Sequence, residues 1–243
     1  LVNGAIVYRA FDPSMAQLAE LLGQHFTVYN YDRRGRGDSG DTQPFAKERE
    51  IEDLQALVED AGGKAMVFGI SSGAVLSLDA AAVTPGIAKV GVYEPALIVD
   101  DSRQPVPADY AEHLMTLAAE GKRDEAVEYF LTQAVGIPTE YIGGMKQDQA
   151  TWSGMTGVAH TIAYDAAFVG NLMQGKPLPT DRWVKVTVSV LVADGGASDA
   201  WIQHGADALA KVLPHASHHT LAGQTHMVDP KVLAPVLIEF FQQ

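Results

Sequence analysis

A serine lies between two glycines in the stretch "GISSG" at residues 69–73, directly after one apolar run and directly before another. On a tight turn between a strand and a helix, a serine projects its hydroxyl from the edge of a sheet, and flanking glycines let the two backbones approach. The following helix would place its positive dipole end beneath that hydroxyl, with the N–H of Ser72 facing a developing oxyanion. The spacing therefore predicts a nucleophile at Ser71, with a simple glycine-rich turn as the alternative.

A serine nucleophile needs a base, because its hydroxyl is unreactive at neutral pH until an imidazole takes the proton. The chain has eight histidines, and His226 lies in the loop "LAGQTHMVDP", between a short predicted strand and the last predicted helix. His215, His218 and His219 lie in or before that strand, where packing or solvent-facing roles are expected. We therefore expect His226 to be the base.

The composition excludes several classes of protein. With 243 residues, 47% of them apolar, the chain can bury one large core. A formal net charge of -13 argues against a nucleic-acid surface, which requires a basic footprint. The basic cluster of Arg33, Arg34 and Arg36 lies beside acidic residues and is predicted to be a structured turn rather than a phosphate site. The absence of cysteine excludes disulfides, catalytic thiolates and zinc–cysteine sites, and it suits a cytoplasmic protein.

The order of the predicted elements indicates an α/β fold. Short β-branched runs alternate with amphipathic stretches, which is typical of βαβ units in a mostly parallel sheet. Strands are expected at 26–32, 65–69, 89–94, 184–194 and 217–222. Helices are expected at 14–22, 48–61, 72–82, 201–213 and from Pro230, with Asp229 as its cap. Between residues 95 and 181 the strand signal disappears, and prolines punctuate several helical stretches.

Four motifs together resemble those of one known family. "GISSG" resembles the nucleophile turn of the α/β-hydrolase superfamily, "DRRGRGDS" at 32–39 the turn after its fourth strand, and "GQTHM" at 223–227 its histidine loop. "VNGA" at 2–5 resembles the family's His-Gly oxyanion turn, with Asn3 where histidine is usual. The resemblance implies a parallel sheet flanked by helices, a second oxyanion donor at the N–H of Ala5, and no cofactor or metal. It also implies that the chain starts at the family's third strand, with the first two strands absent from it.

The resemblance also implies how the chain is divided. Residues 1–94 and 182–243 correspond to the hydrolase core, and residues 95–181 to a helical cap, which in this family sets substrate choice. Candidate pocket residues in this cap are Tyr129, Trp152 and Tyr164. Packing between helices is the alternative role for each of them. Collectively they favour an apolar or aromatic substrate.

The carboxylate that would orient the histidine has three candidates. The family's usual acid follows the seventh strand in a Gly-x-x-Asp pattern, but "DGGASD" places Ser198 at that position, flanked by Asp194 and Asp199. Glu94 closes the predicted strand 89–94, and some members, zearalenone-type lactonases among them, carry their acid there. A glutamate that ends an apolar strand is an unusual place for an unpaired charge. Glu94 is therefore the preferred prediction, and the two aspartates remain alternatives.

These residues and the resemblance predict a serine hydrolase, an esterase or lactonase that cleaves a small, rather apolar carboxylic ester or lactone through an acyl-enzyme. We expect a small-molecule substrate, no nucleic-acid or membrane partner, and a monomer or homodimer. The same fold also supports lyases, cofactor-free oxygenases and haloperoxidase-like enzymes, and a ligand-binding receptor with little turnover is a further alternative.

Overall fold

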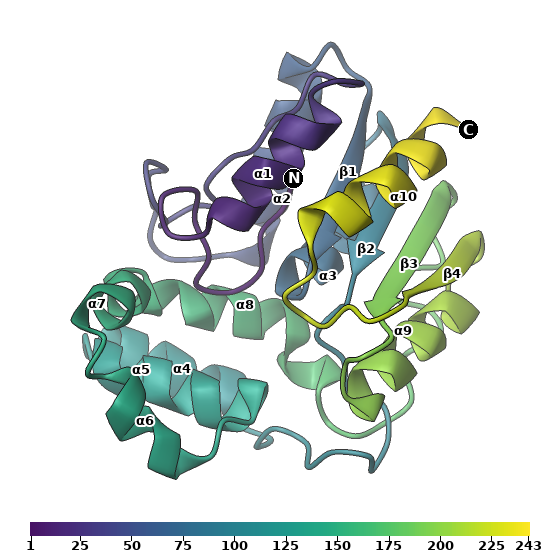
Figure 1. Ribbon diagram of the computed structural model, residues 1–243. Coiled ribbons are helices and arrows are strands. Elements are labelled where there is room, and N and C mark those ends of the chain that lie inside the picture. The colour runs from purple at the N-terminus through teal and green to yellow at the C-terminus, as the bar shows by residue number, and fades with distance from the viewer.

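The computed structural model describes residues 1–243, and its centre is a four-stranded sheet in the order β1-β2-β3-β4, with every neighbouring pair parallel. The strands are β1 (Ala65–Ile70), β2 (Ile87–Tyr93), β3 (Ser189–Gly195) and β4 (Ala216–Leu221). In the register, Ile70 pairs with Tyr93, and Tyr93 pairs with Ala193. The carboxyl ends of β1, β2 and β3 therefore lie side by side along one edge of the sheet (Figure 1).

Helices cover both faces of this sheet. Side chains alternate between the faces of a strand, so Val190 and Val192 of β3 join one buried cluster, and Leu191 and Ala193 join the other. The first cluster includes residues of α2 (Lys47–Asp60), α3 (Ser72–Ala81) and α9 (Ala200–Val212). The second includes residues of α1 (Pro13–Leu22) and α10 (Pro230–Gln242), which pack against each other. None of the helices combines the length and the apolar character that crossing a membrane requires.

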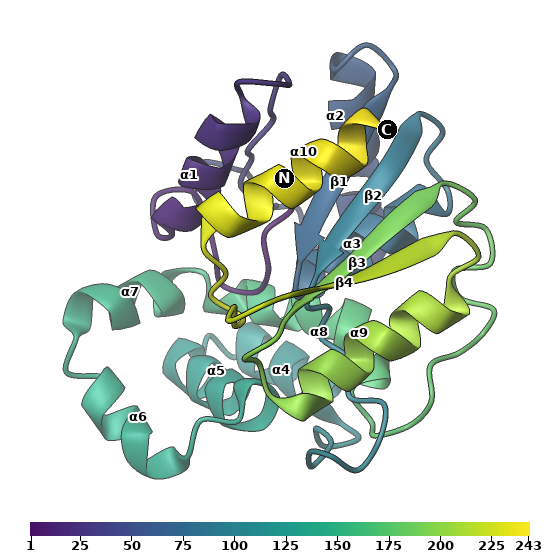
Figure 2. The same ribbon diagram turned by 45° about the vertical axis from the view of Figure 1, so that its right-hand side comes forward.

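Residues 110–172, called the helical layer below, lie between β2 and β3 in the sequence. They form α4 (Tyr110–Ala119), α5 (Arg123–Tyr129), η1 (Phe130–Val135), α6 (Thr139–Met145), α7 (Gln149–Gly157), η2 (Ala159–Thr161), α8 (Ile162–Val169) and η3 (Gly170–Leu172). The helical layer lies beyond the carboxyl ends of the strands in both views (Figures 1 and 2). Helix α8 contacts α2 and α3, so it joins the helical layer to the helices of the sheet.

Most predicted elements occur within a few residues of their expected bounds, but one strand prediction was wrong and a second strand is shorter than predicted. Residues 26–32 do not form a strand. The N-terminal segment, which could have paired with them, forms only a single bridge, between Val2 and Gly69 of β1. Without a continuous neighbouring strand, their backbone groups have no ladder to join. The strand expected at 184–194 begins only at Ser189, because Val186 N–H closes a turn onto the carbonyl of Trp183.

Gly69 lies where β1 passes close to α3. A Cβ at Gly69 would clash with the carbonyl of Gly73 and the hydroxyl of Ser77. We expect Gly69→Ala to lower the free energy of unfolding by about 1–3 kcal/mol, because overpacking forces the strand and the helix apart. Urea denaturation followed by circular dichroism measures this change.

The matched control is Gly143→Ala in α6, where an added Cβ meets nothing within 4 Å. Since alanine forms helix better than glycine, the free energy of unfolding of this variant should rise by up to about 1 kcal/mol. A Gly69→Ala variant whose urea denaturation midpoint is at or above that of the wild type would contradict the close approach of β1 and α3.

Candidate active site

Ser71 occupies a strained turn between β1 and α3. Its backbone has φ 57° and ψ -124°, a region that non-glycine residues rarely adopt. The N–H of Ser71 donates to the carbonyl of Tyr93 at 3.0 Å, which ties the turn to β2. Gly4 lies so close that a Cβ there would be 3.0 Å from Ser71 Cβ, so the 3–5 segment packs directly beside the serine. Ser71 also lines the cavity described below.

Glu94 is the carboxylate that contacts His226. Its Oε2 lies 2.8 Å from His226 Nδ1, and its side chain is fully buried while that of His226 is 46% exposed. Glu94 Oε1 accepts from the N–H of Gly195 at 2.8 Å and from Ser198 Oγ at 2.5 Å. Ser198, which takes the position of the family's usual acid, thus helps to hold the glutamate. With Nδ1–H donating to Glu94, the imidazole keeps Nε2 free to accept a proton.

The two alternative acids lie elsewhere. Asp194 is buried, and its Oδ2 is 3.1 Å from Nε2 of a different histidine, His218. Asp199 is exposed and precedes the first turn of α9. Neither makes a hydrogen bond to His226, so the structure brings Glu94 alone of the three candidates to the imidazole.

A cavity of about 480 Å³ lies between the carboxyl edge of the sheet and the helical layer, and Ser71, Ser72, Glu94 and His226 all line it. Much of its wall is apolar, and the helical layer contributes Tyr110, Phe130, Leu131, Ala134, Ala166 and Val169. Its charged lining residues are all acidic: Asp12, Glu94, Asp165 and Asp199. A second, mostly apolar cavity of about 370 Å³ lies along residues 26–31, α2 and β1, and contains none of the site residues.

The three aromatic residues expected in the pocket lie outside this lining. Tyr129 stacks on Tyr110, with ring centroids 5.7 Å apart. The indole of Trp152 donates to Asp124 at 2.7 Å, inside the helical layer. Tyr164 stacks on Phe45 at 3.9 Å, so it joins the helical layer to the loop before α2. Helix packing thus uses these rings, and their neighbours Tyr110 and Phe130 reach the cavity instead.

The residues expected to supply oxyanion donors, Ala5 and Ser72, both line the cavity together with Ser71. Ser72 is the first residue of α3, where a backbone N–H has no intrahelical acceptor. The N–H of Ala5 makes no hydrogen bond within the chain. Both amides are therefore free to bind an oxygen of a bound molecule.

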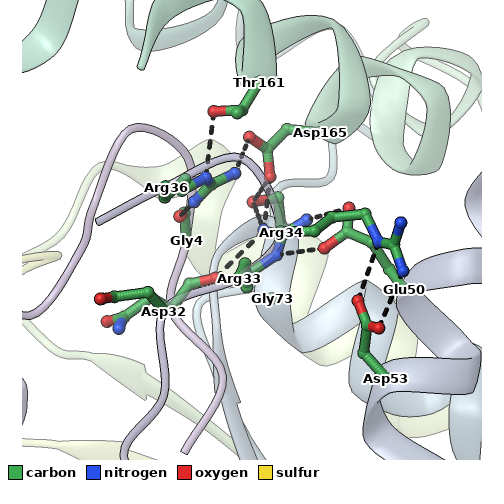
Figure 3. Close-up of polar contacts among 12 residues, drawn as sticks. Gly4, Asp32, Arg33, Arg34, Arg36, Glu50, Asp53, Gly73, Thr161 and Asp165 are labelled. Atoms are coloured by element: carbon green, nitrogen blue, oxygen red, sulfur yellow. Dashed lines mark hydrogen bonds and ion pairs between the residues drawn. The ribbon is translucent and has the colours of Figure 1, made fainter. Parts of the chain in front are cut away.

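A buried ionic network, which sequence reasoning missed, lies beneath these amides. We call Arg33, Arg36, Glu50 and Asp165 the buried network; their side chains are at most 4% exposed. Asp165 of α8 bonds Arg33 Nη1 at 2.6 Å and Arg36 Nη2 at 2.5 Å, and Glu50 of α2 bonds Arg33 Nε at 2.7 Å (Figure 3). The basic cluster is thus a structured turn, as predicted. The one sequence signal for the partner was an aspartate within the apolar run "IAYDAAFV".

Opposite charges within the buried network stabilise the ionised forms of Asp165 and Arg33. Burial alone would raise the pKa of the Asp165 carboxyl, but the guanidinium groups of Arg33 and Arg36 outweigh burial, and the pKa is lowered. Burial would lower the pKa of Arg33, and the neighbouring carboxylates of Asp165 and Glu50 raise it overall. Both shifts favour the charged forms of Asp165 and Arg33, as good partners do for buried ions. Burial lowers the pKa of Arg36, and the neighbouring charge of Arg33 lowers it further, although Asp165 opposes this shift.

Comparison with known families agrees with this fold: the chain belongs to the alpha/beta hydrolase family, whose family model matches residues 1–236. No protein of curated function matches the chain.

Solved structures show the same architecture. An alpha/beta hydrolase from Sphaerobacter thermophilus is 53% identical with a TM-score of 0.87, over 99% of this chain and 90% of that chain. An enol-lactonase from Burkholderia xenovorans is 19% identical with a TM-score of 0.68, and the match covers 100% of this chain and 90% of the lactonase. An esterase from Thermogutta terrifontis is also 19% identical with a TM-score of 0.68, and the match covers 99% of this chain and 88% of the esterase. The last two likenesses concern the fold alone.

Proposed function

We propose that this protein is a serine esterase or lactonase that acts on small, neutral, rather apolar esters. The observation that carries the proposal is the 2.8 Å contact between His226 Nδ1 and Glu94, beside the strained turn of Ser71. The enol-lactonase and the esterase among the fold neighbours are compatible with this activity. Their identity to this chain is too low to carry the argument.

In the proposed reaction, Ser71 Oγ attacks the ester carbonyl while His226 Nε2 takes the hydroxyl proton. The carbonyl oxygen becomes an oxyanion, which the N–H groups of Ser72 and Ala5 bind. Glu94 stabilises the imidazolium, which then protonates the leaving alcohol as its bond to the acyl carbon breaks. A water molecule, deprotonated by His226, attacks the acyl-enzyme and releases the acid and free Ser71.

Ser71 and His226 must approach each other before this reaction, because their side chains make no hydrogen bond in the structure. Contacts of this kind are commonly long before substrate binds and tighten in the complex. The side chain of His226 is half exposed, so fewer neighbours restrict its rotation than restrict the buried carboxylate of Glu94. Closing this gap would let Ser71 Oγ donate a hydrogen bond to His226 Nε2, which is the contact that the proton transfer requires.

The cavity argues for the substrate class. Ligand sites typically have volumes of about 300–1,000 Å³, so about 480 Å³ suits a small ester. The lining holds four carboxylates and no lysine or arginine. Of these four, Asp165 is paired with Arg33 and Arg36, and Glu94 contacts His226. A substrate that carries its own carboxylate would still meet the like charges of Asp12 and Asp199, which raises its free energy of binding. We therefore propose neutral esters or lactones as substrates.

We expect Glu94→Gln to lower kcat by about three to four powers of ten, because the amide keeps the shape but loses the charge that stabilises imidazolium. The matched variants Asp194→Asn and Asp199→Asn should lower kcat far less. The measurement is kcat/KM for one activated ester, with circular dichroism to verify each fold. A folded Glu94→Gln variant with wild-type turnover would remove Glu94 from the triad and return the acid to the loop after β3.

We expect p-nitrophenyl butyrate to be hydrolysed at least about tenfold faster, in kcat/KM, than the p-nitrophenyl monoester of succinate, whose free carboxylate faces the acidic lining. Asp199→Asn should narrow this ratio, because it removes one lining charge. The control Asp207→Asn, on α9 outside the cavity lining, should leave the ratio unchanged. Equal rates for both esters, or faster succinate cleavage, would contradict the proposed substrate class.

A further inference from the structure

We propose that Arg36, locked in place by Asp165, is a positioning residue that orients and polarises the peptide unit carrying the N–H of Ala5. The proposal rests on the proposed function, because it assigns this N–H to an oxyanion hole. It gives the buried network a role in catalysis besides holding the helical layer on the sheet.

The geometry centres on one peptide unit. Arg36 Nη1 donates to the carbonyl oxygen of Gly4 at 2.5 Å (Figure 3). That carbonyl and the N–H of Ala5 belong to the same planar amide, and this peptide bond is trans. In a planar trans unit the C=O and N–H bonds point in opposite directions. Fixing the oxygen therefore fixes where the N–H of Ala5 points, which is away from Arg36.

The charge of Arg36 adds to this orientation. A hydrogen bond from a cation draws electron density toward the carbonyl oxygen and leaves the N–H at the other end more positive. Because Arg36 is only 1% exposed, water does not screen its charge as it would at the surface. An oxyanion bound to the N–H of Ala5 would be stabilised more than by an isolated peptide. A neutral ground-state carbonyl would gain much less.

Asp165 connects Arg36 to the second donor. Its Oδ2 bonds Arg36 Nη2 at 2.5 Å, and its Oδ1 accepts from Ser72 Oγ at 2.6 Å. Thr161 Oγ1 accepts a further bond from Arg36 Nε at 3.0 Å. One carboxylate of the helical layer thus contacts Ser72, which carries one proposed donor, and Arg36, which contacts the peptide unit of the other. Arg33 supports the same segment through the carbonyl of Asn3 at 3.1 Å.

Arg34 provides a comparison within the same turn, from an ion pair that is more exposed than that of Arg36. Its guanidinium pairs with Asp53 at 2.8 Å and bonds the carbonyl of Arg49, and it makes no hydrogen bond to residues 3–5. Removing Arg34 deletes one ion pair between this turn and α2. Removing Arg36 deletes an ion pair and also the contact to the Gly4 carbonyl.

The experiment compares Arg36→Met, Arg36→Lys and Arg34→Met with the wild type on p-nitrophenyl butyrate. Arg36→Met should lower kcat by about a hundredfold, as expected for a weakened oxyanion donor, with little change in KM. Arg36→Lys should recover part of the loss, because it keeps the charge and one donor. Arg34→Met should keep wild-type kcat, with thermal unfolding recorded for every variant.

A second readout separates orientation of the donor from general damage. A trifluoromethyl ketone forms an adduct on the serine that carries an oxyanion, whereas the methyl ketone of equal length binds mainly as a neutral carbonyl compound. In Arg36→Met, affinity for the trifluoromethyl ketone should fall in parallel with kcat, and affinity for the methyl ketone should stay within about threefold. A purely structural role would weaken both ketones alike or neither, and either result overturns the proposal.

If Arg36→Met fails to fold, Arg36→Met/Asp165→Asn carries the test, because it leaves Arg33 paired with Glu50 and no buried charge unmatched. The double variant should show the same selective loss. Wild-type kcat in either folded variant overturns the role of Arg36 while leaving the proposed function intact. A wild type that cleaves no ester and does not bind the trifluoromethyl ketone refutes the proposed function itself.

Discussion

The site depends on a constraint at the ends of two adjacent parallel strands. Ile70 and Tyr93 are the last paired residues of β1 and β2. The residue that follows each strand has a positive φ, 57° at Ser71 and 42° at Glu94. Both strands therefore end at the same level of the sheet, and the chain leaves the ladder of hydrogen bonds at Ser71 and at Glu94. Such conformations persist only where the surroundings enforce them. Here the N–H of Ser71 is held by the carbonyl of Tyr93, and that of Glu94 by the carbonyl of Ala193.

The buried network is the second constraint. Charges of this kind are costly to bury, and their mutual attraction roughly offsets that cost only with good geometry. Their main effect is therefore on position rather than on stability. Asp165 is 93 positions from Ser72 and 132 from Arg33, yet it bonds both side chains. Directional bonds consequently hold the helical layer to the turn of Ser71 and Ser72, and they fix the position of the helices that line the cavity.

Much of the fold could be predicted because its signals are local. The helices at 13–22, 72–81 and 230–242 follow from apolar spacing and, for the last, from Asp229 followed by Pro230. The glycines around Ser71 likewise encode the tight turn. Residues 26–32 have a strand-like composition, but a strand forms only with a neighbouring ladder, and composition does not report whether the neighbour is present.

The details of the site were harder to predict because they depend on distant contacts. The spacing "DGGASD" left three acids open, and the choice depends on where Glu94, Ser198 and His226 meet in space. Tyr129, Trp152 and Tyr164 are aromatic residues of the kind that line pockets, yet each packs between helices or against a loop. Helical periodicity shows which residues share a face. It does not show whether that face meets a cavity or another helix.

The central claim is that Ser71 is an activated nucleophile. The most direct measurement is reaction of the intact protein with a neutral alkyl fluorophosphonate, followed by mass spectrometry of its peptides to locate the phosphonyl group. The account predicts one adduct per chain, on Ser71 and not on the adjacent Ser72, formed far more slowly in His226→Ala because the base is missing. No adduct on the folded wild type, or labelling at Ser71 that is equally fast without His226, would contradict it.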